Sequence, residues 1–259
     1  METIKKQRKA KEYRLGTEPF PIKKQIMFFS IGWIGFRVLA VVIELIVGGI
    51  IAGINHQSLK EALSTYSSSI IVNSLAYLIL LTVLLLISYS DTLKLIKSFK
   101  QYQSFIAAAI CVVAIFVFNY QYSYFLAILR NLGILEKPVT DNANQSSLVS
   151  LEQLYPFTSL IIFGFVGPIC EEITYRVGLF SLLKRKSHFL AYFVTIVVFA
   201  FIHFNYSTTN LLNEILNLPY YAFAAAAFSF TYDHFGFAAS TTAHITNNVV
   251  SLVLVSVIH

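Results

Sequence analysis

Long apolar runs recur along this chain of 259 residues, and they constrain its fold more than any other feature of the sequence. A helix needs about 20 predominantly apolar residues to cross the hydrocarbon core of a bilayer, and several runs here reach that length. Only 12% of the residues are charged, whereas an average soluble domain carries about a quarter. The sequence therefore predicts an all-α fold, that of a polytopic helical protein in the cell membrane.

The runs predict about seven transmembrane helices, separated by polar or basic segments. The expected spans cover residues 26–54, 69–89, 105–126, 156–183, 189–204, 218–232 and 237–258. The segments expected to be loops or turns are 56–68, 91–104, 130–155, 205–217 and 233–236. The Gly-Pro pair at 167–168 is expected to kink or restart the fourth helix, because proline lacks a backbone donor and clashes with the preceding turn.

Basic residues gather in segments that would share one side of the membrane. Of the 19 Lys and Arg, 14 fall within residues 1–25, 91–104 and 184–186. Because cytoplasmic segments are enriched in Lys and Arg, the N-terminus is predicted to lie inside. The segments 91–104, 184–186 and 233–236 are then predicted to be inner, and the segments 56–68, 130–155 and 205–217 to be outer. The same rule explains the net charge of +6 without a nucleic-acid partner. We divide the chain into a basic cytoplasmic tail (1–25), a part with the first three spans (26–153) and a region that carries the candidate site (154–259).

The first expected span contains two charged residues, Arg37 and Glu44. They are seven positions apart and so lie on one face of a helix. A charge at the bilayer centre costs roughly 2.5–3.5 kcal/mol on insertion scales. We therefore expect both side chains to form ion pairs, with each other or with other helices, and to take no part in chemistry.

The fourth span carries three charges within six residues, Glu171, Glu172 and Arg176. Together they would cost on the order of 8–10 kcal/mol if unpaired in the bilayer, so they must either pair or perform chemistry. Glu172 and Arg176 are four apart, share a helix face and can form an ion pair. Glu171 is rotated by about 100° from Glu172 and needs a partner from another helix or a water. Glu171 is therefore the candidate general base.

Two later spans add polar residues at four-residue spacing, Phe199 with His203 and His244 with Asn248. The Phe199 ring can pack over the His203 imidazole and hold it. If these groups converge with Glu171, a carboxylate and an imidazole would hold a water beside two donors for an oxyanion, which suits amide hydrolysis. Taken singly, each residue has a commoner structural explanation, such as an Asn that hydrogen-bonds neighbouring helices.

Together these motifs resemble the CAAX-protease and bacteriocin-processing (Abi) family, whose members are type II CAAX prenyl endopeptidase-like intramembrane proteases. The resemblance rests on Glu-Glu-x-x-x-Arg at 171–176, Phe-x-x-x-His at 199–203 and His-x-x-x-Asn at 244–248. It covers roughly residue 155 to the C-terminus. It implies that Glu171 and His203 activate a water, that His244 and Asn248 form the oxyanion hole, and that Glu172 and Arg176, with Phe199, support the site.

The metal content is a separate question for this site. Glu171, His203 and His244 would make a plausible zinc site of two histidines and one carboxylate. However, the sequence has no His-Glu-x-x-His helix, the commonest zinc-protease signature. We expect a reaction without a metal, in which a glutamate activates the water, and keep zinc as the alternative.

The leading hypothesis is an intramembrane endopeptidase whose partners are the lipid bilayer and a peptide or protein substrate. Candidate substrates are a leader peptide, a bacteriocin or pheromone precursor, or a CAAX-like C-terminus. One alternative is a non-catalytic membrane regulator or self-immunity protein of the same fold, acting on a partner such as a sensor kinase. Another is a transporter that uses the buried charges as a proton relay, although the sequence shows no internal repeat.

Overall fold

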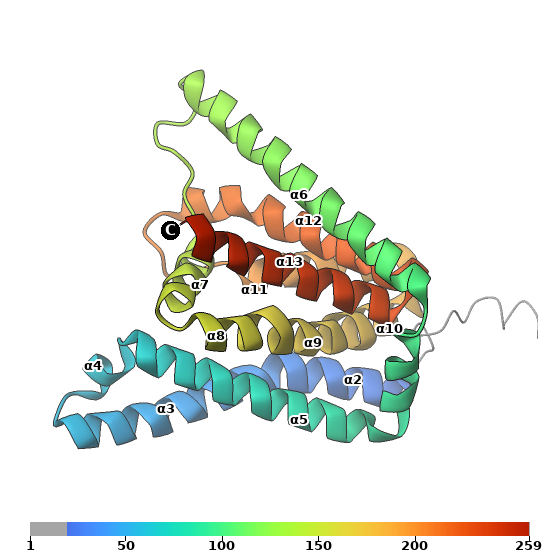
Figure 1. The fold of residues 1–259 in the computed structure, drawn as a ribbon, viewed down its shortest axis with the longest axis horizontal. Coiled ribbons are helices and arrows are strands. Elements are labelled where there is room, and N and C mark those ends of the chain that lie inside the picture. The colour runs from blue at the N-terminus through green and yellow to red at the C-terminus, as the bar shows by residue number, and fades with distance from the viewer. Residues whose placement is uncertain (1–19, 259) are drawn as a thin grey trace, which may run out of the picture. The chain divides into compact units, whose positions relative to one another are not determined.

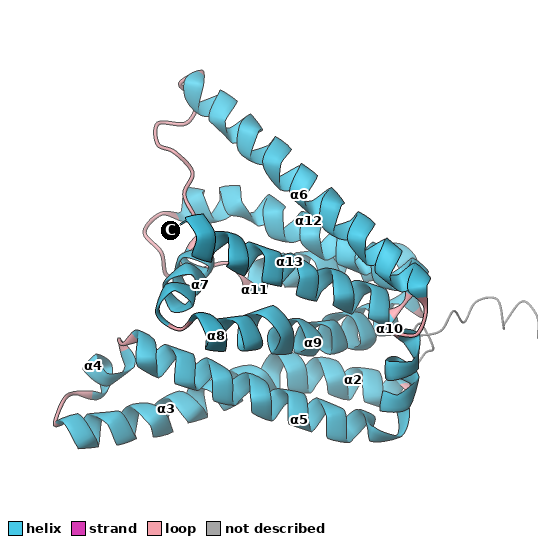
Figure 2. Ribbon diagram, viewed as in Figure 1, coloured by secondary structure: helices cyan, strands magenta, loops and turns pink. Residues whose placement is uncertain are grey.

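The computed structural model describes residues 20–258, in which every regular element is a helix and no strand occurs (Figure 2). The prediction of an all-α fold is therefore confirmed for this part of the chain. Most of the predicted basic tail, residues 1–19, lies outside the described residues. The position of the N-terminus relative to the membrane stays a prediction.

Four helical stretches among the described residues are long and apolar enough to cross a membrane. They are Ile22–Asn55, Tyr66–Tyr89, Tyr102–Asn131 and Pro156–Lys184. A shorter apolar helix, His188–Ile202, follows them. This is a multi-pass membrane protein. Helices also form where the sixth and seventh spans were expected, but the count of seven spans stays a prediction.

The chain forms two compact units, which we name after the motif residues they carry. The glutamate unit contains the described parts of residues 19–93, 148–182 and 245–259. Its elements, in chain order (Figure 1), are α2 (Ile22–Ser30), the π-helix η1 (Ile31–Gly35), α3 (Phe36–Asn55), α4 (Leu59–Leu63), most of α5 (Tyr66–Ser98), the end of α7 (Ala143–Leu154), α8 (Pro156–Ser159), the π-helix η2 (Leu160–Val166), α9 (Gly167–Glu171), the π-helix η3 (Glu172–Phe180), the start of α10 (Ser181–Lys184) and the end of α13 (Phe237–Ile258).

Close helix contacts in the glutamate unit depend on glycines. A Cβ added at Gly178 of η3 would lie 2.9 Å from the backbone nitrogen of Phe29 in α2, and a Cβ at Gly32 of η1 would lie 1.9 Å from the Thr174 hydroxyl oxygen. These contacts hold η3, which follows directly on Glu171, against α2 and η1. The fourth span changes from π-helix to α-helix at Gly167, where the sequence predicted a restart.

The histidine unit contains the described parts of residues 94–147 and 183–244. Its main helices are α6 (Tyr102–Asn131), α11 (His188–Ile202), α12 (Leu211–Phe235) and the first part of α13. Helix α12 packs against both α6 and α11 (Figure 1). A cluster of small and aromatic side chains forms the core between α6, α12 and α13: Ala108, Cys111, Val112, Ile115, Phe228 and Ala243.

The helices extend further into the expected loops than the apolar runs indicated. Helix α5 ends at Ser98 and α6 begins at Tyr102, so three residues replace the expected loop 91–104. The expected loops 56–68 and 130–155 contain α4 and α7, and α12 begins inside the expected loop 205–217. The turn before α13 is a single residue, Gly236, whose φ of 90° favours glycine.

Polar capping residues explain several of these differences. Ser58 and Glu61 form a capping box at the start of α4, with both reciprocal hydrogen bonds present. Asn210 caps α12 by accepting a hydrogen bond from the Asn213 backbone. Such caps lie outside the apolar runs, and a reading based on hydropathy assigned these residues to loops.

The expected ion pairing of Arg37 and Glu44 is wrong for the described part of the chain. Both side chains are exposed, and neither forms an ion pair with another described residue. The Arg37 guanidinium instead lies over the ring of Trp33, 5.5 Å from its centroid. A stacked guanidinium on an aromatic face replaces the carboxylate that the spacing suggested.

Candidate active site

Glu171 ends α9 in the glutamate unit. One of its partners comes from another helix, which is one of the two possibilities that we expected from the sequence. The Tyr77 hydroxyl on α5 donates to Glu171 Oε1 across 3.4 Å. The Tyr77 ring is held by Phe36, 4.8 Å between centroids, and by the edge of Phe163 at 6.4 Å. The Cys170 thiol donates to the Tyr77 carbonyl oxygen, 3.8 Å away. The residue before the candidate base therefore ties α9 to the helix that supplies its hydroxyl.

Glu172 and Arg176 form the ion pair that the spacing predicted. Arg176 Nη1 lies 3.4 Å from Glu172 Oε1, and both side chains have no exposed surface. The two neighbouring glutamates thus have different surroundings: Glu172 is buried beside a guanidinium, whereas Glu171 is half-buried beside a phenol. The roles of the pair and of Glu171 stay predictions.

Asn248 lies on α13, four residues after His244. Its amide nitrogen donates to the Phe163 carbonyl oxygen in η2 at 3.0 Å, and its amide oxygen accepts from Asn247 at 3.2 Å. These two contacts orient the amide, with its nitrogen toward Phe163 and its oxygen toward Asn247. An amide nitrogen carries two hydrogens, so one hydrogen is left for a further acceptor.

The histidine unit brings two of the expected residues, His203 and His244, together around the ring of a third, Phe199. The Phe199 ring meets His203 edge-on, with 5.2 Å between centroids, which confirms the expected contact. The same ring lies 5.9 Å from the His244 imidazole. His244 is buried and stacks on Phe228 at 4.4 Å. One phenylalanine therefore contacts the histidines of two different motifs.

The sequence reading missed three residues that contact the candidate site. Tyr77 reaches Glu171, Tyr221 of α12 stacks on His203 at 4.5 Å, and Asn142 donates to the His203 carbonyl oxygen at 3.1 Å. The two tyrosines carried a weak signal, since a buried tyrosine in an apolar run needs a partner for its hydroxyl. Asn142 carried none, because it lies in a polar segment with several similar residues.

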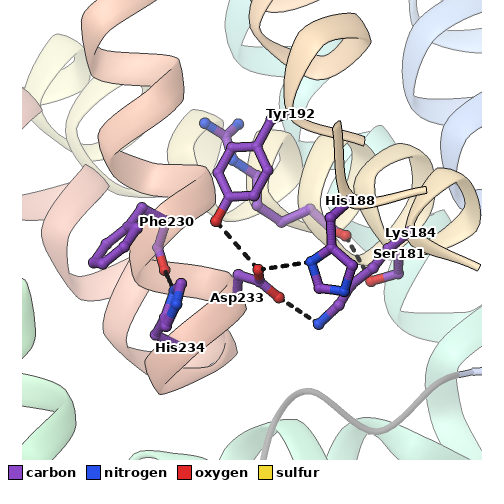
Figure 3. A network of polar contacts seen from close by, with 8 residues as sticks. Ser181, Lys184, His188, Tyr192, Phe230, Asp233 and His234 are labelled. Atoms are coloured by element: carbon purple, nitrogen blue, oxygen red, sulfur yellow. Dashed lines mark hydrogen bonds and ion pairs between the residues drawn. The ribbon is translucent and has the colours of Figure 1, made fainter. Parts of the chain in front are cut away.

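A second polar cluster in the histidine unit lies at the far end of α11 from His203. Asp233 of α12 is bound by Lys184, by the Tyr192 hydroxyl at 3.2 Å and by His188 Nδ1 at 3.6 Å (Figure 3). His188 begins α11 and His203 follows its end, so about 22 Å of helix separate them at 1.5 Å per residue. The Asp233 cluster joins the start of α11 to the end of α12 and belongs to the scaffold.

Among the described residues, no group of three or more His, Cys, Asp or Glu side chains is arranged to hold a metal ion. Metal dependence stays a prediction.

Comparisons with known proteins point to one family. Residues 153–250 match the family described as type II CAAX prenyl endopeptidase Rce1-like. An uncharacterized protein of Mycoplasma capricolum is 29% identical over 177 residues, or 62% of this chain and 48% of that protein. The UPF0177 protein YvdC of Lactococcus lactis is 26% identical over 92 residues, 34% of each chain. The matches thus span half or less of these relatives. No solved structure matches the chain.

Proposed function

We propose that this chain is an intramembrane endopeptidase, because residues 153–250 match the family described as type II CAAX prenyl endopeptidase Rce1-like, the family that the three motifs resemble. The family is a protease family, and all four expected catalytic residues lie inside the matched region. The substrate would be a peptide or protein segment presented at the membrane, such as a leader peptide, a bacteriocin or pheromone precursor, or a CAAX-like C-terminus.

The observation that carries the proposal is the difference between the two adjacent glutamates. Glu172 is fully buried with Arg176, so its charge is compensated. Glu171 instead accepts a hydrogen bond from a phenol and keeps part of its surface exposed. An ionisable group at membrane depth is a functional candidate by default, which supports Glu171 as the group that accepts a proton from a water.

In the proposed reaction, Glu171 takes a proton from a water that the His203 imidazole helps to hold. The water oxygen attacks the carbonyl carbon of the scissile peptide bond, and a C–O bond forms. His244 and the second amide hydrogen of Asn248 donate to the resulting oxyanion. Collapse of this intermediate breaks the C–N bond, and the proton held by Glu171 passes to the leaving amine.

The first test compares the peptides released by cells that make the native protein with those from cells that make Glu171→Gln at equal abundance. Glutamine keeps the shape of the side chain and removes the base, so a defined set of peptides should disappear, and their ends would give the cleavage site. Glu44→Gln is the matched control, since it neutralises an exposed carboxylate of an apolar helix. Its peptide profile should equal the native one.

If cells with Glu171→Gln released the same peptides as cells with the native protein, the proposed catalytic role of Glu171 would be contradicted. If a cellular phenotype of the native protein also survived that substitution, the non-catalytic regulator or immunity role would take its place. The substitution therefore separates an enzyme from a scaffold of the same fold.

A further inference from the structure

The orientation of the His203 imidazole is set by few contacts. His203 follows the last residue of α11, and its backbone nitrogen donates to Ala200 across 3.3 Å. Carbonyl groups at a helix end have no partner within the helix, so the backbone there needs an outside anchor. Within the described part of the chain, neither ring nitrogen of His203 takes part in a hydrogen bond. The contacts that the structure shows on the imidazole are packing contacts with aromatic rings.

Tyr221 provides this packing on one face of the ring. Its ring stacks on the imidazole with 4.5 Å between centroids and 15° between planes, while Phe199 meets the imidazole edge-on. Both ring nitrogens lie in the ring plane, so a stack that fixes the plane also fixes where they point. The Tyr221 hydroxyl donates in turn to Asn142 Oδ1 at 3.0 Å.

Asn142 joins the stack to the backbone of His203. Its amide nitrogen donates to the His203 carbonyl oxygen at 3.1 Å, and its amide oxygen accepts from Tyr221 and from the Gln145 backbone at 2.9 Å. The side chain is 2% exposed. One buried amide therefore holds both the helix end that carries His203 and the ring that stacks on it.

The segment around Asn142 is itself fastened to α12 at several points. Thr140 N donates to Asn213 Oδ1 at 3.0 Å, and Asn217 Nδ2 donates to Thr140 O at 2.9 Å. Ala143 N donates to Glu214 Oε1 at 3.0 Å, and the other oxygen of that carboxylate, Oε2, accepts from Asn205 N, after α11, at 3.0 Å. Glu214 is 3% exposed and binds the backbone at two places, one residue after Asn142 and two residues after His203. Asn142 is thus a fixed point and not the side chain of a free loop.

We propose that Asn142 and Tyr221 are the positioning residues of His203, and that they aim its imidazole at the reacting water. This inference rests on the proposed function. It extends the functional set beyond the family match, because Asn142 lies before residue 153. Neither residue needs to touch the substrate: Asn142 acts through Tyr221 and the His203 backbone, and Tyr221 acts through its ring face.

The first measurement reads the stack directly, without any substrate. NMR of the ring-labelled histidines is recorded on the full chain in nanodiscs, and the His203 signal is assigned by its loss in His203→Gln. Tyr221→Leu removes the ring and should shift the His203 ring protons downfield. Tyr221→Phe keeps the ring and should leave most of the ring-current shift. Tyr220→Phe is the matched control, since it removes a hydroxyl bonded to Ser123 at 2.7 Å, and should change nothing at His203.

The second measurement is the rate of peptide release at equal protein abundance. Asn142→Ala and Tyr221→Leu should each lower it about tenfold or more, because misplacing a reacting group by about 1 Å can cost about 100-fold. Tyr221→Phe should retain more activity than Tyr221→Leu, and Tyr220→Phe should match the native rate. This order of release rates would show that activity depends on the packing of the His203 ring. The loss of a tyrosine hydroxyl by itself would not produce it.

The outcomes separate this inference from the proposed function. A His203 signal that does not move in Tyr221→Leu overturns the stack and the inference. Native release rates in Asn142→Ala and Tyr221→Leu also overturn it if Glu171→Gln and His203→Gln abolish release. If the His203 signal moves but Glu171→Gln leaves release unchanged, the proposed function fails, while the positioning of the imidazole stands.

Discussion

The pair of Glu172 and Arg176 can be tested separately from any chemistry. Both side chains are fully buried in η3, 3.4 Å apart. Removing one partner of a buried pair leaves an uncompensated charge and typically costs about 3–5 kcal/mol. We therefore expect Arg176→Ala to lower the thermal unfolding midpoint of the purified protein strongly. Arg37→Ala removes an exposed guanidinium and should change the midpoint little.

The same experiment distinguishes a charge effect from a packing effect. A double variant, Glu172→Leu with Arg176→Met, removes both charges and keeps much of the volume. It should be more stable than Arg176→Ala alone, since an apolar replacement of a buried pair is often nearly neutral. If Arg176→Ala were as mild as Arg37→Ala, Arg176 would not be the residue that compensates Glu172.

At the scale of helices, the contact of η3 with α2 sets how closely the segment after Glu171 can approach its neighbour. A Cβ at Gly178 would lie 2.9 Å from the Phe29 nitrogen and 3.3 Å from the Gln25 carbonyl oxygen, both backbone atoms. We expect Gly178→Ala to cost about 1–3 kcal/mol, the usual range for overpacking, measured as a loss of thermal stability. The cost arises because neither atom can move without shifting α2.

Gly49 of α3 provides the control for this prediction. A Cβ there would meet nothing within 4 Å, and alanine is a better helix former than glycine by about 1 kcal/mol. Gly49→Ala should therefore be neutral or slightly stabilising. Equal losses in the two alanine variants would show that glycine acts through the helix backbone and not through the contact with α2.

The helices show what the sequence could and could not predict. Hydropathy predicted where they lie, because every backbone group in a bilayer must be satisfied within a helix or a closed sheet. The spacing of Glu172 and Arg176 predicted their pair, since both lie on one local turn. It failed for Arg37 and Glu44, because the nearest available partner of Arg37 was an aromatic ring on the same helix. Sequence spacing predicts whether two residues on a helix are close to each other. It does not show which other side chains can contact the same residue.

The candidate site could be predicted only where its residues form local motifs. Phe199 and His203 are one turn apart, so their contact followed from helical geometry. Tyr77 and Asn142 are 94 and 61 residues away in sequence from the residues they contact, Glu171 and His203. Contacts over such separations depend on how the helices pack, so no local sequence pattern predicts them.

At the scale of the whole molecule, the contacts at the two ends of the histidine unit bear on membrane topology. Lys184 pairs with Asp233, and both lie in segments predicted to be inner. Thr140 binds Asn213 and Asn217, and all three lie in segments predicted to be outer. Segments that touch must share a side of the membrane, so the two predicted outer segments should be labelled together and the two inner ones together.

Single cysteines test this prediction in a chain whose own two buried cysteines, Cys111 and Cys170, are replaced. We expect Lys137→Cys and Ser207→Cys to react with a membrane-impermeant maleimide on intact cells. Lys186→Cys and His234→Cys should react only after the cells are opened. All four positions are exposed, so a lack of reaction reports the side of the membrane and not burial.

The grouping matters more than the absolute side. If all four positions exchanged sides together, the N-terminus would lie outside, and the charge rule would be the part that failed. If Lys137→Cys and Ser207→Cys reacted from opposite sides, the contacts of Thr140 with α12 could not exist in the membrane. Asn142 would then have no route to His203, so this labelling also checks the basis of the positioning proposal before any substrate is known.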